Sequence, residues 1–335
     1  MAGDGFGVVQ IGAGGAGMAH MRAVSAHPDC RLVAAADVAE PARSAAAAAF
    51  EVPVYADYRD MLDRHAKDAS IAIVVVPHHI YPDAIEAVVD AGLHILKEKP
   101  FARSLQDADR MQTALRGHDR VFMTAGQRFF APAYRAALER AADGSLGDIY
   151  LAQGRITYAW RPDGQGWGWR GDRALSGGTA ILDAGWHLLE ALHAFQGQPD
   201  RVYAVSGGMR ASAGDWTTDD KGALTLEYPN GSVATAVACH VALPDQFEVL
   251  LHGTRGNLEL TTARMVRYDR NAVVESQDWA GVDLFAAQLD HFLDCVRGAG
   301  KPAFGLDVSM DLQRVVDAAY RSAATRLPIE LAPRT

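Results

Sequence analysis

The segment FGVVQIGAGGAG occupies residues Phe6–Gly17 and decides the fold of the chain around it. Its first half, Phe6–Ile11, is an apolar, β-branched run that predicts a buried strand, and a helix is expected from Gly15 to His27. Between them the sequence follows the pattern G-x-G-x-x-G: Gly12, Ala13, Gly14, Gly15, Ala16 and Gly17. In a strand–turn–helix context such glycines let backbone N–H groups approach a pyrophosphate at the helix N-terminus.

Asp37 provides the second test of this interpretation. It ends the next expected strand, Arg31–Ala36, and follows Gly17 by twenty positions. A carboxylate there accepts hydrogen bonds from an adenosine ribose, whereas the alternative is that it caps the helix expected near Glu40. The spacing from the glycine turn favours the ribose. Because a carboxylate would repel a 2′-phosphate, we expect NAD in preference to NADP.

Strands and helices continue to alternate up to about residue 126, which predicts a doubly wound parallel sheet. Ligands bind outside the carboxyl ends of such strands. The loops that follow the strands Ser70–Val76 and Val121–Ala125 are therefore expected to contribute to the cofactor site: Val76, Pro77, His79 and Gln127. The pair His78-His79 could also suggest a metal, but no third ligand lies at a useful spacing, so no metal is expected.

The stretch His94–Pro100 reads HILKEKP and follows the same logic. Pro100 fixes its own φ and disfavours helical geometry at Lys99, so the strand has to stop there. Lys99, with Glu98 beside it, is therefore expected at the mouth of the ligand crevice.

The chain changes character after residue 126. Alternating runs between Ile149 and Leu260, with the hairpin signal Asn230-Gly231, predict an α+β domain with a large, open, mostly antiparallel sheet. We divide the chain into residues 1–126, a dinucleotide-binding Rossmann domain, and 127–335, a domain for substrate binding and oligomerisation. Either of two late helices, 285–296 or 308–324, could return to the first domain. An open sheet face needs a cover, and a homodimer or homotetramer would supply it.

Two groups of side chains in this second half are candidates for substrate binding. The loop after the strand Ile149–Trp160 is rich in tryptophan, and its aromatic rings either stack on a sugar-like ring or simply pack the loop. Asp183 and His187 are four residues apart, so they would share one face of a helix expected to run to Phe195. A carboxylate beside an imidazole suits general acid–base work, although a plain helical ion pair is the alternative. The candidates for substrate contact are Lys99, Arg128, Trp160, Trp169, Arg170, Asp183 and His187.

Composition excludes several classes of protein. A net charge of −9, without a basic stripe, argues against a nucleic-acid partner. No apolar run approaches the length of a membrane span, and the amino terminus lacks a signal-peptide pattern, so no membrane association and a cytoplasmic location are expected. The three cysteines are far apart in the sequence, which argues against a disulfide framework.

Taken together and in order, these motifs resemble the Gfo/Idh/MocA family of NAD(P)-dependent oxidoreductases. The likeness rests on GAGGAG, Asp37, LKEKPFA (96–102) and GGTAILDAGWH (177–187), and it extends to HGTRGNLEL (252–260) and AAYRSAATRLPIEL (318–331). The resemblance implies hydride transfer between a nicotinamide and a secondary alcohol or ketone of a sugar, a sugar derivative or a cyclitol, as in inositol dehydrogenases. One departure is Tyr81, where many members have a histidine.

The resemblance also implies roles for three catalytic residues. His187 would exchange the proton of the substrate hydroxyl, Asp183 would orient the imidazole, and Lys99 would bind the reacting oxygen. Two alternatives remain open at this stage: an NAD-dependent glycosidase that acts through a transient keto-sugar, and a non-catalytic NAD-binding regulator.

Overall fold

The computed structural model describes residues 5–160, 167–208 and 216–332. The chain forms two compact units, each with its own sheet. Unit 1 comprises Met1–Ala102, Gln106–Gln127 and Asp283–Ser309, and unit 2 comprises Arg103–Leu105, Arg128–Val282 and Met310–Thr335. The main division falls next to the expected boundary at residue 126, but both units are discontinuous in sequence.

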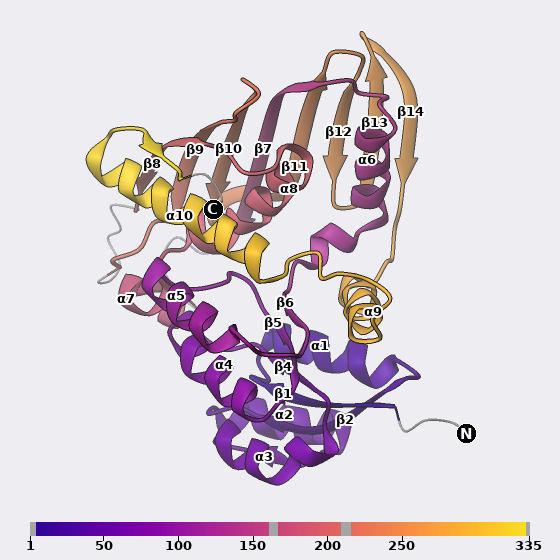
Figure 1. The fold of residues 1–335 in the computed structure, drawn as a ribbon, viewed down its shortest axis with the longest axis vertical. Helices are drawn as coiled ribbons and strands as arrows, with labels where there is room; N and C mark the ends of the chain where they lie inside the picture. The colour runs from indigo at the N-terminus through magenta and orange to yellow at the C-terminus, as the bar shows by residue number, and fades with distance from the viewer. Residues whose placement is uncertain (1–4, 161–166, 209–215, 333–335) are drawn as a thin grey trace. The chain divides into compact units, whose positions relative to one another are not determined.

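Unit 1 is built on a six-stranded parallel sheet with the strand order β3-β2-β1-β4-β5-β6 (Figure 1). The strands are β1 (Phe6–Ile11), β2 (Cys30–Ala36), β3 (Val54–Tyr55), β4 (Ile71–Val74), β5 (His94–Lys97) and β6 (Phe122–Thr124). The order reverses between β1 and β4, and ligands bind at such a switch point. The doubly wound Rossmann fold expected from the sequence is therefore confirmed.

Helices and short 3₁₀ turns connect these strands. They are α1 (Gly15–Ala26), α2 (Glu40–Phe50), α3 (Tyr58–His65), η1 (Ala66–Asp68), η2 (His78–Ile80), α4 (Tyr81–Asp90) and α5 (Leu105–Leu115). Unit 1 also includes α9 (Leu284–Val296), which comes from late in the chain. Helix α9 packs against α1, and the ring of Phe285 meets that of His20 edge-on at 4.8 Å. One of the two late helices thus returns to the Rossmann unit.

Unit 2 contains a nine-stranded sheet with the order β14-β13-β12-β11-β7-β10-β9-β8-β15. Only the β7–β10 pair is parallel among the strand pairs of this sheet that the structure describes. Its strands are β7 (Ile149–Ala159), β8 (Arg201–Gly207), β9 (Lys221–Glu227), β10 (Val233–Cys239), β11 (Val241–Gly253), β12 (Asn257–Thr261), β13 (Arg264–Asp269), β14 (Ala272–Asp278) and β15 (Ile329–Glu330). The expected open, mostly antiparallel sheet is confirmed.

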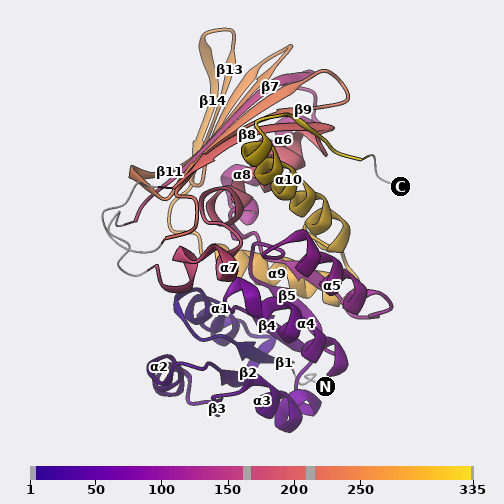
Figure 2. The same ribbon diagram turned by 90° about the vertical axis from the view of Figure 1, so that its left-hand side faces the viewer.

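The two faces of this sheet differ. Helices α6 (Pro132–Ala142), α8 (Trp186–Gln196) and α10 (Leu306–Thr325) lie along one face, and no described helix lies on the other (Figures 1 and 2). The alternation of side chains explains the difference, because every second residue of β9 and β10 is buried. On the opposite face Tyr203, Val205 and Val237 are 41, 52 and 44% exposed.

Strands β13 and β14 lie beyond the runs that the sequence predicts. All but one of the β14 residues are exposed, so no alternation of apolar side chains marks this strand. Antiparallel pairing with β13 holds it in the sheet. Backbone hydrogen bonds leave no compositional signal, and hydrophobic periodicity therefore cannot reveal such an edge strand.

The single α-helix expected up to Phe195 is wrong in its first part. Residues Ala180–Ala184 form a π-helical segment, η5, in which the Gly185 N–H donates to the Ala180 carbonyl 2.8 Å away. Helix α8 begins only at Trp186. The assumption of α-helical spacing between Asp183 and His187 therefore fails.

Candidate active site

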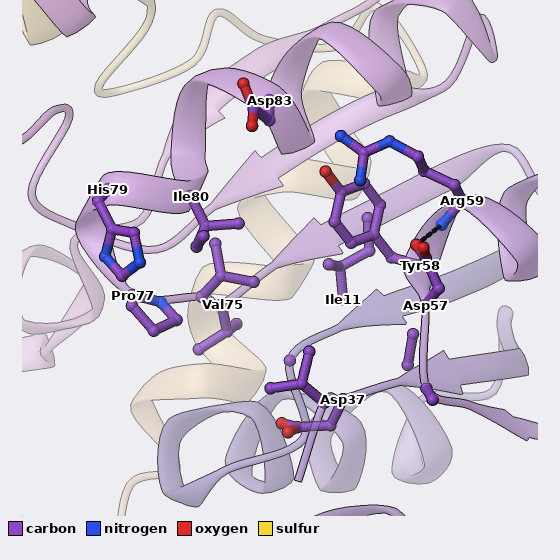
Figure 3. A pocket seen from close by; sticks show the side chains of 15 residues that line it. Ile11, Asp37, Asp57, Tyr58, Arg59, Val75, Pro77, His79, Ile80 and Asp83 are labelled. Carbon is purple, nitrogen blue, oxygen red and sulfur yellow. Dashed lines mark hydrogen bonds between the residues drawn. The ribbon is translucent and has the colours of Figure 1, made fainter. Parts of the chain in front are cut away.

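A cavity of about 400 Å³ opens at the carboxyl ends of the first strands of unit 1 (Figure 3). Val75, Pro77, His79 and Ile80 line one side, and the ring of Tyr58 faces them from the other (Figure 3). The wall also includes five of the residues assigned to the cofactor from the sequence: Gly12, Asp37, Val76, Pro77 and His79. The cavity lies where a doubly wound sheet binds its ligand.

The glycine turn fits a dinucleotide. A Cβ atom on Gly12 would lie 1.8 Å from the Val75 carbonyl oxygen, and one on Gly17 would lie 2.1 Å from the Gly12 oxygen. Gly14 and Gly15 instead have open space around that position, with nothing within 4 Å. Gly14 is the N-cap of α1, and no side chain caps the helix. The first turn of α1, which includes Ala16, thus offers exposed N–H groups to an anion.

The Asp37 carboxylate connects the glycine turn after β1 with the loop after β2. Its Oδ2 accepts a hydrogen bond from the Ala13 N–H at 2.8 Å, and its Oδ1 accepts one from the Ala39 N–H at 2.8 Å. Helix α2 has Ala39 as its N-cap without a side-chain bond, so Asp37 does not cap the helix in the usual way. Arg43 donates to the carbonyls of Asp37 and Val38, both at 2.9 Å.

Lys99 lies two residues beyond the end of β5, which is Lys97. The preceding residue, Glu98, is 5% exposed, and its Oε2 accepts from the Lys99 N–H at 3.0 Å while Oε1 lies 3.1 Å from His20 Nε2. Burial alone would raise the pKa of Glu98, but the bond with His20 and the nearby positive charges hold it below its ordinary value. Glu98 is therefore a buried carboxylate engaged with its own neighbours.

The other residues assigned to the cofactor lie elsewhere in unit 1. Gly14, Gly15, Ala16, Gly17, Glu98, Lys99 and Gln127 are not part of the cavity wall. Gln127 lies at the start of the short helix η3 (Gln127–Phe130), and its buried Oε1 has no hydrogen-bond partner among the described residues. An unsatisfied buried acceptor of this kind suits a ligand donor.

Asp183 and His187 lie in unit 2, where both are buried, at 4 and 3% exposure. Asp183 Oδ2 accepts a hydrogen bond from Arg170 Nε at 3.1 Å. His187 Nδ1 lies 3.1 Å from Glu190 Oε2, one turn further along α8. Since a carboxylate only accepts hydrogen bonds, Glu190 favours a proton on Nδ1. Glu190 thus contacts the Nδ1 side of the imidazole, a contact that the sequence analysis did not predict.

The π-helical segment that carries Asp183 is held by a buried carboxylate. Asp219, 3% exposed, accepts hydrogen bonds from the N–H groups of Thr179 and Ile181, both at 2.9 Å. The Tyr320 hydroxyl donates to Asp219 at 3.0 Å and accepts from the Leu182 N–H at 3.2 Å. These contacts satisfy the donors at the start of η5, which would otherwise be unpaired.

The tryptophans pack largely on other rings. Trp167 is 2% exposed and stacks on Trp216 with centroids 4.4 Å apart, and Trp160 meets His240 at 5.0 Å. Residues 161–166 of the same loop lie outside the described residues. The Trp169 ring lies 4.3 Å from the Arg170 guanidinium. Loop packing thus explains Trp167, whereas Trp160 and Trp169 are half-buried.

Arg128 is anchored on the sheet of unit 2. Its guanidinium donates to the Tyr158 hydroxyl at 3.0 Å and to the Thr262 hydroxyl at 3.3 Å. It also lies 5.4 Å from the centre of the Phe247 ring. Its side chain is thus held by residues of β7 and β11 and by the turn that follows β12.

The side chains of these sites that have no counterpart in the sequence assignments include Tyr58, Glu190 and Asp219. Tyr58 begins α3 and carries no motif. Glu190 lies three residues after His187, a spacing that places two helical residues on one face and could have revealed it. Asp219 is adjacent to Asp220 in an irregular segment, and only the fold brings it to η5.

Comparison with known families decides the classification. The family "Oxidoreductase family, NAD-binding Rossmann fold" matches residues 6–125, and its "C-terminal alpha/beta domain" matches residues 139–331. The chain belongs to the Gfo/Idh/MocA family. It is an NAD(P)-dependent oxidoreductase with an NAD(P)-binding Rossmann unit, as the sequence motifs predicted.

Individual relatives are sugar dehydrogenases. D-xylose 1-dehydrogenase (NADP(+)) 2 of Haloferax volcanii is 27% identical over 301 residues, which is 87% of this chain and 89% of that protein. Levoglucosan dehydrogenase of Pseudarthrobacter phenanthrenivorans is 25% identical over 74% of this chain and 71% of its own length. A solved levoglucosan dehydrogenase with NADH and levoglucosan has a TM-score of 0.90 at 20% identity, covering 97 and 99% of the two chains. At 20% identity, this structural likeness shows that the two chains share a fold.

Two further findings concern metal ligands and membrane-spanning helices. In residues 5–160, 167–208 and 216–332, no group of three or more metal-ligating side chains is placed to hold an ion. None of the helices in these ranges combines the length and the apolar character that crossing a bilayer requires.

Proposed function

We propose that the protein transfers a hydride between NAD(H) and a secondary alcohol or ketone of a sugar, a sugar derivative or a cyclitol. The observation that carries the proposal is the buried acid–base group of unit 2, in which Glu190 holds the imidazole of His187 and Arg170 holds the carboxylate of Asp183. Family membership supports redox chemistry on such substrates.

The cofactor would be held by unit 1. The first turn of α1 would bind the pyrophosphate, and Asp37 would bind the adenosine ribose. The residues proposed to line the cofactor are Gly12, Gly14, Gly15, Ala16, Gly17, Asp37, Val76, Pro77, His79, Glu98, Lys99 and Gln127. A bound nicotinamide supplies a hydride acceptor or donor.

The proton is exchanged at His187. Because Nδ1 is engaged by Glu190, we assign the exchange to Nε2, which removes the hydroxyl proton during oxidation and returns it during reduction. Asp183 stabilises the imidazolium form. Lys99 binds the reacting oxygen and favours negative charge on it. Positioned acid–base groups contribute on the order of 10²- to 10⁴-fold to the rate.

NAD is the proposed cofactor. The carboxylate of Asp37 would oppose a 2′-phosphate, and Arg43 Nη1 is already bound to two backbone carbonyls. Two relatives are named as NADP(+)-dependent and solved neighbours carry NADH, so the proposal of NAD rests on the charge of Asp37 and on the bonds of Arg43.

The substrate would be a small polyol or sugar. Relatives named for D-xylose and levoglucosan support this class, as do the polar and aromatic side chains proposed to contact it: Lys99, Arg128, Trp160, Trp169, Arg170, Asp183 and His187. Rings such as Trp160 and Trp169 can stack on the apolar face of a sugar. We also propose a homodimer or homotetramer, formed through the uncovered sheet face of unit 2.

Screening tests the proposal directly. D-xylose, levoglucosan and myo-inositol are incubated with NAD⁺ and with NADP⁺, and reduced cofactor is followed by absorbance. We expect turnover with NAD⁺ on at least one of these compounds. His187→Asn should reduce turnover by about 10²-fold or more while NADH still binds.

Other results would redirect the proposal. A His187→Asn variant with wild-type turnover would remove His187 from the mechanism. Release of an aglycone from glycosides without net NADH would point to the glycosidase, and NADH binding without turnover on a broad panel would point to a regulator.

A further inference from the structure

Lys97 is a buried lysine two residues before Lys99. It is the last residue of β5, and its side chain has no exposed surface. Its strand neighbours are Val74 on β4 and Thr124 on β6, which are also fully buried. Lysine is almost never fully buried unless its charge is compensated. The surroundings of this ammonium group therefore call for a physical explanation.

Hydrogen bonds and an aromatic ring compensate the charge. Lys97 Nζ donates to the carbonyl oxygens of Glu98 and Pro100, both at 2.6 Å. The same nitrogen lies 3.3 Å from the centre of the Tyr81 ring, whose π face attracts a cation. Burial lowers the pKa of Lys97 well below its ordinary value, although the Glu98 carboxylate acts in the opposite direction and the Lys99 charge adds to the fall.

Tyr81 adds a contact to the residue between these two carbonyls. Its hydroxyl donates to the Lys99 carbonyl at 3.5 Å, and Tyr81 itself is 2% exposed. Together Lys97 and Tyr81 engage three successive carbonyls, those of residues 98, 99 and 100. On the amide side, the Glu98 carboxylate accepts from the Lys99 N–H at 3.0 Å. The backbone of Lys99 is thus fixed from both sides.

We propose that Lys97 and Tyr81 form a clamp that positions Lys99. The inference rests on the proposed function, in which Lys99 binds the reacting oxygen. A lysine has a long, flexible side chain, so its ammonium can be placed accurately only if its backbone is rigid. Lys97 and Tyr81 do not touch the substrate in this scheme and are positioning residues.

The chemistry of Tyr81 suits this clamp. Its phenol ring offers the buried ammonium a negative π face, whereas a protonated imidazole at the same position would repel it. Lys97 and Tyr81 should therefore act as a pair. The hydrocarbon ring matters more than the hydroxyl, because the hydroxyl bond at 3.5 Å is long.

Substitutions at the two positions test the pair. Lys97→Met and Tyr81→Leu should each lower kcat by about tenfold or more, since small misplacements of catalytic groups cost up to about 10²-fold. The dissociation constant of NADH should change little. Tyr81→Phe keeps the ring and should keep most of kcat. The double variant should lose less than the product of the two single losses, because the partners share one interaction.

A chemical readout makes the test independent of turnover. Competitive labelling with acetic anhydride, followed by peptide mass spectrometry, reports the reactivity of Lys99 relative to exposed Lys221 over a range of pH. Lys97→Met and Tyr81→Leu should change the labelling profile of Lys99, and Tyr81→Phe should not. Leu96→Met, a buried substitution on the same strand, is the matched control and should leave both kcat and labelling unaltered.

The outcomes separate the clamp from the proposed function. If Lys99→Met keeps wild-type turnover, the assigned role of Lys99 fails whatever the clamp does. If Lys99→Met loses turnover while Lys97→Met and Tyr81→Leu keep both turnover and the Lys99 labelling profile, the clamp is wrong. Should Lys97→Met fail to fold, the contrast between Tyr81→Leu and Tyr81→Phe decides.

Discussion

At the scale of single residues, three titratable side chains carry the main arguments about this chain: Asp37, His187 and Lys97. Asp37 is one of three aspartates that line the cavity of unit 1, His187 is a buried imidazole held by Glu190, and Lys97 is a cation enclosed by carbonyls and a ring. Each charge has a specific partner. Substitutions that remove one charge should therefore have separate and measurable effects.

Asp37 should control the choice of cofactor. Asp37→Asn removes the charge and leaves one of the Ala13 and Ala39 N–H groups without its acceptor. We expect the dissociation constant of NADH to rise by about tenfold, because bonds to a charged acceptor contribute roughly 1.5–3 kcal/mol. Binding of NADPH should weaken less or improve. Fluorescence titration at constant ionic strength measures both constants.

Asp57 provides the control for this prediction. It lines the same cavity, but its carboxylate accepts from the Arg59 N–H at the start of α3 (Figure 3). Asp57→Asn should leave the ratio of NADH to NADPH affinity unchanged. An equal change in both variants would contradict a specific role for Asp37.

Lys97 should make the stability of the protein depend on pH. Its pKa is lowered by burial, so between the folded value and the unfolded value of about 10.4 the unfolded chain binds the extra proton. The free energy of unfolding should therefore rise with pH in this window. Lys97→Met removes that contribution. Urea denaturation at several pH values up to about 10.4 should show that the free energy of unfolding of the wild type rises relative to that of Lys97→Met as the pH increases. A constant difference would contradict the lowered pKa of Lys97.

At the scale of secondary structure, the parallel strands were predictable and the π-helical segment was not. Strands such as β4 are continuous apolar runs buried on both faces, which sequence patterns reveal well. Segment η5 depends on Asp219 and Tyr320, which lie about 40 and 140 positions further along the chain. Local periodicity cannot report contacts over such separations. The contact between His187 and Glu190 is different, because residues three apart on a helix share one face and this spacing could have revealed it.

Asp219 should be among the most sensitive positions of unit 2. Asp219→Ala leaves the buried N–H groups of Thr179 and Ile181 without acceptors, and each loss costs about 1–3 kcal/mol. We expect the free energy of unfolding to fall by about 3 kcal/mol, measured by urea denaturation. Asp172→Ala, which removes the exposed N-cap of α7 (Arg173–Ser176), should cost only about 1 kcal/mol. Equal losses of unfolding free energy in the two variants would contradict the role of Asp219 in holding segment η5.

At the scale of the whole molecule, the sequence predicted both sheets and the family. The βα alternation predicts a parallel, doubly wound first sheet, and the period of two predicts strands in the second sheet that are buried on one face. The strand order itself comes from the structure. The discontinuity of the units was less predictable. Helix α9 reads as an ordinary amphipathic helix, and nothing in its own residues says which sheet it joins.

The uncovered sheet face should mediate the proposed oligomer. Val205 on β8, Ala223 on β9 and Val237 on β10 are aligned across adjacent strands, and the two valines are 52 and 44% exposed. The double variant Val205→Lys/Val237→Lys introduces two charges and should shift the sedimentation coefficient toward that of a monomer. Val282→Lys, an exposed valine outside the sheet, should have no effect. A wild type that is monomeric at all concentrations would refute the proposal.

The glycine turn after β1 has a consequence for how this chain tolerates mutation. Gly12 and Gly17 are required by backbone atoms that are present whether or not a dinucleotide is bound. Gly14 and Gly15 face open space, so alanine there leaves the empty protein undisturbed. A library selected only for soluble expression should retain the first pair and lose the second. Only selection for cofactor binding should retain all four glycines. Two of them are thus constrained by the fold of the chain itself, and the other two by the ligand.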